Sequence, residues 1–60
     1  MVTKHYCNGK EVATYEGSKS IEVITSEIKT VNTLVIDKVT SNEIKYHDNN
    51  GNTFIIVVNN

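Results

Sequence analysis

Two histidines and a single cysteine are the side chains of this 60-residue chain best suited to metal binding. His5 and Cys7 are two residues apart, so they share a face if this segment is a strand. With His47 or Asp48 they could ligate zinc or another transition metal. Structural zinc sites mostly use several cysteines, however, and this chain has one. We therefore predict no metal site.

Cys7 and a histidine are also the residue types of a nucleophile–base pair. Catalysis further requires an oriented base, an oxyanion hole and a concave pocket. The residues around Cys7 form no catalytic signature, and 60 residues leave little material for such a pocket. The sequence therefore predicts a protein that is not an enzyme, with no catalytic residues and no cofactor.

An Asn-rich stretch, DNNGN, has the spacing of oxygen-rich calcium loops. Asp48, Asn50 and Asn52 match the start of a D-x-N-x-N pattern. That pattern continues with glycine and glutamate where this chain has Thr53 and Asn59. We predict a polar hairpin loop here.

Aromatic and basic residues suggest a second type of ligand. The four aromatics and the lysines that could flank them are Tyr6, Tyr15, Tyr46, Phe54, Lys4, Lys10, Lys38 and Lys45. On a small β-barrel of the SH3-like or Sm-like kind, exposed aromatics stack on bases beside lysines. The net charge of −1 and the absence of arginine disfavour nucleic acid as the partner.

Composition and turn residues predict a β-rich fold. Val, Ile and Thr make up 22 of the 60 residues, and such side chains pack well on pleated sheets. Asn8-Gly9 is a strong hairpin signal. We expect strands near residues 2–7, 10–16, 20–25, 28–39 (with a break near Asn32-Thr33), 43–48 and 53–58.

The segment 20–31 allows two interpretations. Ile21, Ile24, Ile28 and Val31 have helical spacing. The many β-branched residues and the absence of a capping box favour a strand instead. We predict an all-β domain spanning 1–60, an antiparallel meander or barrel of five or six strands. The alternative is an α+β fold of order ββαβββ, with a short helix near 20–31.

Hairpin pairing then predicts which residues face the core. A two-residue turn at Asn8-Gly9 gives the first hairpin a core face of Val2, Tyr6, Ala13 and Tyr15. A turn at 40–42 sets Ile36 opposite Tyr46 and Asp37 opposite Lys45. A four-residue loop at 49–52 sets Tyr46 opposite Ile55 and Ile44 opposite Val57.

This register places Phe54, Ile56 and Val58 on the second face of the last strand, as an apolar set that needs its own cover. Either residues 20–31 or a partner would supply that cover. We therefore predict a protein-interaction module that self-associates or binds another protein through an apolar β face or a strand edge. The predicted interaction face is Phe54, Ile56 and Val58. The nucleic-acid-binding small barrel is the alternative.

The longest apolar run, Phe54 to Val58, is far shorter than the ~20 residues of a membrane helix. The first ten residues lack the apolar core of a signal peptide. We therefore expect a cytoplasmic protein that does not bind membranes. Eight asparagines without arginine or proline are typical of AT-rich genomes, such as those of low-GC bacteria and their phages. For a binding module from such a source, we consider the role of a phage or mobile-element regulator or inhibitor.

Overall fold

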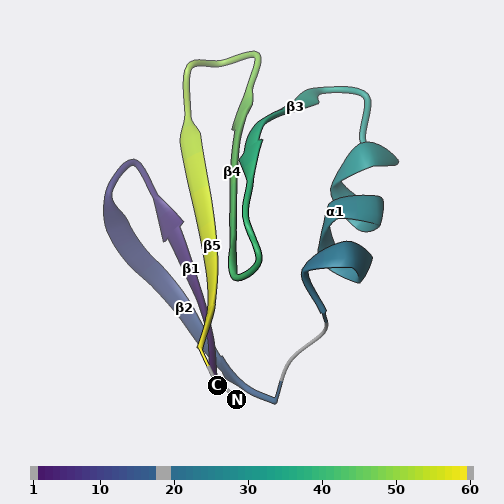
Figure 1. The fold of residues 1–60 in the computed structure, drawn as a ribbon. Helices are drawn as coiled ribbons and strands as arrows, with labels where there is room; N and C mark the ends of the chain where they lie inside the picture. Colours follow the sequence, from purple (N-terminus) through teal and green to yellow (C-terminus); the bar gives the residue numbers. More distant parts are fainter. Residues whose placement is uncertain (1, 18–19, 60) are drawn as a thin grey trace.

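A computed structural model describes residues 2–17 and 20–59, which form one five-stranded antiparallel sheet with a helix on one face (Figure 1). The elements follow the order β1 (Val2–Cys7), β2 (Lys10–Glu16), α1 (Ile21–Lys29), β3 (Leu34–Val39), β4 (Glu43–Asp48) and β5 (Thr53–Asn59). In space the strands are ordered β2-β1-β5-β4-β3, so β5 is the middle strand.

Four of the expected strands are confirmed at nearly the predicted positions, and the expected strand 28–39 is confirmed only over its second part, Leu34–Val39. The preference for strand within 20–31 is wrong: residues 21–29 form α1, so the ββαβββ alternative is the one found. The sheet is an open meander, not a closed barrel, because β2 and β3 lie at its two edges.

Local hydrogen bonds and burial explain why α1 is a helix. The Ser20 side chain caps the helix by accepting the Val23 N–H at 3.3 Å. Ile24 and Ile28 share the face that packs into the core, and both are buried. Burial of this stripe offsets the weak helix propensity of β-branched residues, which is the usual source of stability for short helices.

The core lies between α1 and one face of the sheet. Its buried apolar residues are Ile24, Ile28, Ile44, Tyr46, Ile56 and Val58. Ile44 is fully buried. Leu34 and Ile36 of β3 and Phe54 of β5 pack against this cluster. α1 contacts β3 and β4, so it covers that half of the sheet more closely than the half formed by β1 and β2 (Figure 1).

The register of the last hairpin differs from the prediction by one residue. Ile44 pairs with Ile56 and Tyr46 with Phe54, so the loop spans five residues, 48–52, where we expected four. A one-residue slip moves every side chain to the other face of a strand. Phe54, Ile56 and Val58 therefore face the core, whereas Ile55 and Val57 face away from it.

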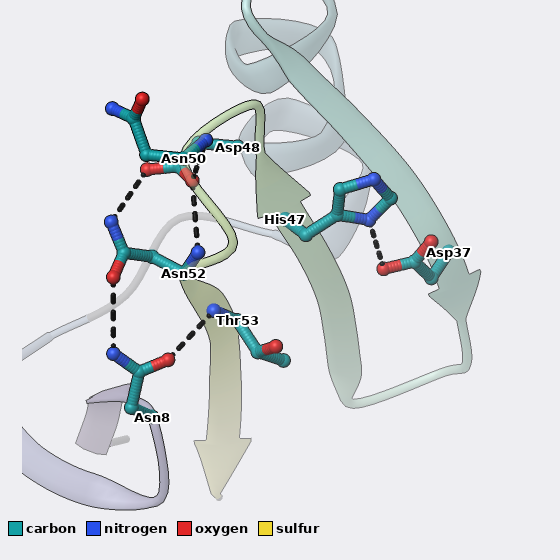
Figure 2. A network of polar contacts seen from close by, with 7 residues as sticks. All are labelled: Asn8, Asp37, His47, Asp48, Asn50, Asn52 and Thr53. Carbon is teal, nitrogen blue, oxygen red and sulfur yellow. Dashed lines mark hydrogen bonds and ion pairs between the residues drawn. The ribbon is translucent and has the colours of Figure 1, made fainter.

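The loop 48–52 has its own hydrogen bonds, which fix its length (Figure 2). The Asp48 carboxylate accepts the Asn50 N–H at 2.9 Å, the Asn52 N–H at 3.0 Å and the Asn52 side-chain amide at 3.0 Å. Gly51 adopts a φ of +86°, a conformation that favours glycine. A carboxylate that accepts several backbone N–H groups favours a tight turn through contacts within the loop itself.

The first hairpin contains a β-bulge that the sequence did not predict. The turn at Asn8-Gly9 is confirmed, with φ values of +52° and +85° and Cys7 opposite Lys10. Val12 is an extra residue in β2, so His5 pairs with Ala13, not with Val12.

The bulge also corrects the predicted core face of this hairpin. Thr3 pairs with Tyr15 and also with Val58 of β5, so Thr3 and Tyr15 share the helix side of the sheet, together with Ala13. Val2 and Tyr6 alternate with Thr3 along β1, so they lie on the opposite side.

The middle hairpin has a second bulge. Ile36 pairs with Tyr46 as predicted, but Asp37 is an extra residue in β3. Lys38, not Asp37, therefore lies opposite Lys45. Both bulges are in edge strands, where such irregularities hinder pairing with another chain.

Candidate functional site: the uncovered face of the sheet

The side of the sheet away from α1, the uncovered face, is the strongest candidate for a binding surface. No described helix or strand packs over it. The register assigns to this face Val2, Lys4, Tyr6, Glu11, Thr14, Glu16, Val35, Lys38, Glu43, Lys45, His47, Thr53, Ile55, Val57 and Asn59. It combines an apolar centre with a charged surround.

Ile55 and Val57 form the centre of the uncovered face because β5 is the middle strand. Ile55 lies between Tyr6 of β1 and Lys45 of β4. Val57 lies between Lys4 of β1 and Glu43 of β4. Tyr6, Ile55 and Val57 are each half-buried by their sheet neighbours, and the remaining apolar surface faces outward.

The charges around this centre are partly paired. Lys4 Nζ lies 3.5 Å from the Glu11 carboxylate. His47 Nδ1 lies 2.7 Å from the Asp37 carboxylate, a contact that is an ion pair when the imidazole is protonated (Figure 2). Lys38 and Lys45 are directly opposite each other, and neither has an ion-pair partner within residues 2–17 and 20–59. Like charges at opposite positions of neighbouring strands repel, so this pair costs the isolated fold free energy.

The predicted interaction face, Phe54, Ile56 and Val58, lies on the covered side of the sheet. Ile56 and Val58 are buried in the core with the helix residues Ile24 and Ile28, and Phe54 is half-buried at its margin. The sequence allowed two covers for this face, residues 20–31 or a partner. In the structure, residues 21–29 cover it. Ile55 and Val57, which we had assigned to the core, hold the outward positions. The extra loop residue is the reason.

The residues considered for metal binding or catalysis are dispersed. His5 is on the covered side, and its Nε2 shares a 3.0 Å hydrogen bond with the Tyr46 hydroxyl. His47 is on the uncovered face, and Asp48 is committed to its loop. Cys7 is half-buried and unpaired. No group of three or more potential metal ligands is present in the described part of the chain.

Burial alters the protonation of the His5–Tyr46 pair. It lowers the pKa of His5 from its ordinary value of 6.5, because the charged imidazolium loses hydration. Burial, with a smaller contribution from Cys7, raises the pKa of Tyr46. Phe54 stacks on Tyr46 with a centroid distance of 5.0 Å. The pair therefore forms a neutral polar contact beside an aromatic cluster.

Asp48 and the asparagines around it hold the loop 48–52 together by hydrogen bonds, in agreement with the predicted polar hairpin loop. Hydrogen bonds from Asn52 lower the pKa of Asp48, and the bond from the Asn52 side chain contributes more than the bond from its backbone. The Asn8 carboxamide joins the loop to the first hairpin by accepting the Thr53 N–H at 2.9 Å and donating to the Asn52 side chain at 3.1 Å (Figure 2). Both Asp48 oxygens already accept protein donors, which explains this loop without a cation.

A cleft of about 450 Å³ opens on the covered side, where α1 does not reach β1 and β2. It is lined by Thr3, His5, Tyr15, Glu16, Gly17, Ile24, Glu27 and Ile56. Its polar groups do not converge on one point: the Thr3 hydroxyl donates to the Gly17 carbonyl at 3.4 Å and His5 bonds to Tyr46. The cleft is therefore a weaker candidate than the uncovered face.

None of the described helices has the length and apolar character required to cross a membrane. Comparison of the chain with protein-family models, with curated proteins and with solved structures gave no match. The uncovered face was missed in the sequence because its position depends on the loop length. The Asp48–Asn52 hydrogen-bonding pattern was the signal that could have shown it.

Proposed function

We propose that this chain is a non-enzymatic protein-interaction module that binds another protein, or a second copy of itself, through the uncovered face. The observation that carries the proposal is the apolar centre of that face, Tyr6, Ile55 and Val57, on a sheet whose other side is covered by α1. Apolar groups at the centre of a charged surround are the usual composition of a protein-binding surface.

The face supports this function better than the strand edges do. Each edge strand carries a bulge, at Val12 in β2 and at Asp37 in β3. A bulge interrupts the regular row of N–H and C=O groups that strand addition uses. The apolar face, in contrast, is on the most regular strand of the sheet.

The dispersed polar residues support a non-enzymatic role. A general base must lie within hydrogen-bond reach of a nucleophile or substrate. His5 is occupied by Tyr46, and His47 by Asp37 on the other side of the sheet. A cytoplasmic location and a regulatory role in a bacterium or phage remain predictions.

Partner capture with matched variants tests the proposed function. Wild-type protein, Val57→Lys and Val23→Lys would be immobilised and exposed to extract from the cells that carry the gene. Val57 is at the centre of the uncovered face, whereas Val23 is 46% exposed on α1. We expect wild type and Val23→Lys to retain the same protein, which Val57→Lys loses while its circular dichroism stays native.

Identical retention by all three proteins, or no retention by any, would contradict the proposal. A second copy of this chain also counts as a retained protein. A label on the immobilised copy distinguishes it from the copy that it captures. A gel-shift titration of the same three proteins at low salt tests the nucleic-acid alternative. Binding that Val57→Lys leaves intact would place nucleic acid elsewhere on the molecule.

A further inference from the structure

We infer that the occupant of the uncovered face is a second copy of this chain, docked about a two-fold axis nearly parallel to β5. The inference rests on the proposed function, because it uses the same face. The inference adds the identity of the partner to the proposed function, and it specifies which residues of the two copies contact each other. The evidence is the arrangement of charges across the sheet.

The sheet has a symmetric strand order around β5. In the order β2-β1-β5-β4-β3, a two-fold axis parallel to β5 places β1 of one copy over β4 of the other. It likewise places β2 over β3. An interface of this kind is isologous, so every contact away from the axis occurs twice. The face must therefore be complementary to itself across β5.

The row of residues through Val57 meets this requirement. Lys4 lies beside Val57 on β1, and Glu43 lies beside it on β4. The two-fold axis sets Lys4 of each copy against Glu43 of the other, and Val57 against Val57. Two ion pairs thus flank an apolar contact.

The row through Ile55 is complementary in the same sense. Across the sheet it contains Glu11, Tyr6, Ile55, Lys45 and Lys38. The axis places Tyr6 of one copy against Lys45 of the other, an arrangement that permits a cation–π contact. It also places Glu11 against Lys38. The repelling pair Lys38 and Lys45 thereby gains partners that a single copy lacks.

Sheet geometry makes the row through Val57 the more exact test. Facing sheets pack about 10 Å apart with their strands crossed by about 30°, and the two-fold axis bisects this angle, so it lies about 15° from β5. This crossing displaces strands next to β5 by only about 2.5 Å, and edge strands by about 5 Å, given a strand spacing of about 4.8 Å. Lys4 and Glu43 are on the adjacent strands, so their pairing is well defined.

The available area predicts a weak to moderate dimer. The molecule measures 30 × 23 × 16 Å along its principal axes, so its broad face approaches the roughly 800 Å² per partner of a standard interface. Interfaces of that size span micromolar to tighter dissociation constants. We expect this one at the micromolar end because its apolar centre is small.

A charge exchange tests the axis directly. Sedimentation equilibrium of wild type, from roughly micromolar to millimolar concentration, should show a monomer–dimer equilibrium. Lys4→Glu and Glu43→Lys should each weaken association at least about tenfold, because each creates two like-charge contacts. An equimolar mixture of the two variants should restore it, because both contacts in the mixed dimer then join opposite charges.

Lys10→Glu is the matched control, since Lys10 pairs with Cys7 on the other side of the sheet. It should leave association unchanged. Loss of the Lys4–Glu11 pair will not confuse the result, because exposed ion pairs contribute little to folding. Circular dichroism confirms that each variant stays folded.

Two results would overturn the inference. The first is a wild type that remains monomeric at every concentration. The second is a mixture of Lys4→Glu and Glu43→Lys that fails to associate. This failure is expected if the two-fold axis runs perpendicular to the strands, because Lys4 and Glu43 then do not meet. After the first result, capture of a different protein that depends on Val57 would leave the proposed function standing, and absence of such capture would remove both. After the second result, self-association that Val57→Lys abolishes would leave the proposed function standing with a different arrangement of the two copies.

Discussion

The two sides of β5 carry the same kinds of side chain in different environments. Ile56 and Val58 are buried beneath α1, where Ile24 and Ile28 complete the core. Ile55 and Val57 alternate with them along the same strand, yet they face away from the helix among lysines and a glutamate. Side-chain chemistry does not separate the two sets. Their difference is set by the length of one loop and the position of one helix.

This comparison shows how little a run of apolar residues says about its own exposure. A continuous apolar strand is expected where both faces are buried. In this fold one face is covered by the chain itself and the other is available to a partner. The apolar residues of the available face are held rigidly, since β5 is paired on both sides.

The largest expected difference in stability is between two variants, each of which places a lysine at one of two neighbouring isoleucines on opposite sides of β5. Ile56→Lys buries an ammonium without a partner, which costs several kcal/mol. A 60-residue domain has a total stability of roughly 3–9 kcal/mol, so we expect this variant to be largely unfolded. Ile55→Lys should cost about 1 kcal/mol and remain folded. Urea denaturation followed by circular dichroism measures both.

Equal losses of stability at the two positions would mean that the uncovered face is also part of the core. If Ile56→Lys stayed folded, α1 would not be the cover of β5. Sedimentation adds a second readout: Ile55→Lys should be monomeric where wild type associates.

A smaller loss of stability is expected from a substitution in the loop 48–52, whose length determines which side chains of β5 face α1. Asn52→Ala removes the side-chain hydrogen bonds to Asp48 and Asn8, each about 3 Å long, and should destabilise the fold by about 1 kcal/mol. Asn49→Ala is the control, because the Asn49 side chain makes no hydrogen bond with the described residues. Thermal denaturation of both variants checks the prediction, and equal midpoints would contradict it.

The smallest effect is a pH dependence that originates at His5, on the covered side. The pKa of folded His5 is lowered below 6.5, so the unfolded chain takes up a proton more readily. Stability should therefore be full above about pH 6.5 and decrease as the pH falls through 6.5 toward the lower pKa of the folded state. Urea midpoints measured across this range should show the decrease.

His5→Gln should remove that part of the pH dependence, whereas His47→Gln on the uncovered face should retain it. A pH profile unchanged by His5→Gln would show that the His5–Tyr46 contact does not disfavour the imidazolium. This comparison separates the two histidines by their side of the sheet.

Local signals sufficed for the strands and for one turn. The strands 2–7, 10–16, 43–48 and 53–58 follow from β-branched residues bounded by turn residues, and the Asn8-Gly9 turn from its tolerance of positive φ. The bulges at Val12 and Asp37 had no comparable signal. A bulge depends on how two strands fit together, which neither strand encodes alone.

The candidate site was predictable in kind but not in position. The apolar excess of residues 54–58 indicated a face that needs a cover, and that inference depended only on composition and alternation. Assigning Phe54, Ile56 and Val58 to that face depended on the loop length, and a single residue reversed it. The Asp48 carboxylate and Asn52 decide that length through hydrogen bonds.

The sequence by itself determined a β-rich domain with an amphipathic isoleucine stripe and a last strand that is apolar on both sides. Only the tertiary structure decided that residues 21–29 are helical, because burial of Ile24 and Ile28 outweighs the local preference of β-branched residues for strands. It also decided which side of β5 that helix covers. Helix packing is set by contacts between distant segments, and the two bulges are set by how neighbouring strands fit together, so neither could be read from the local pattern.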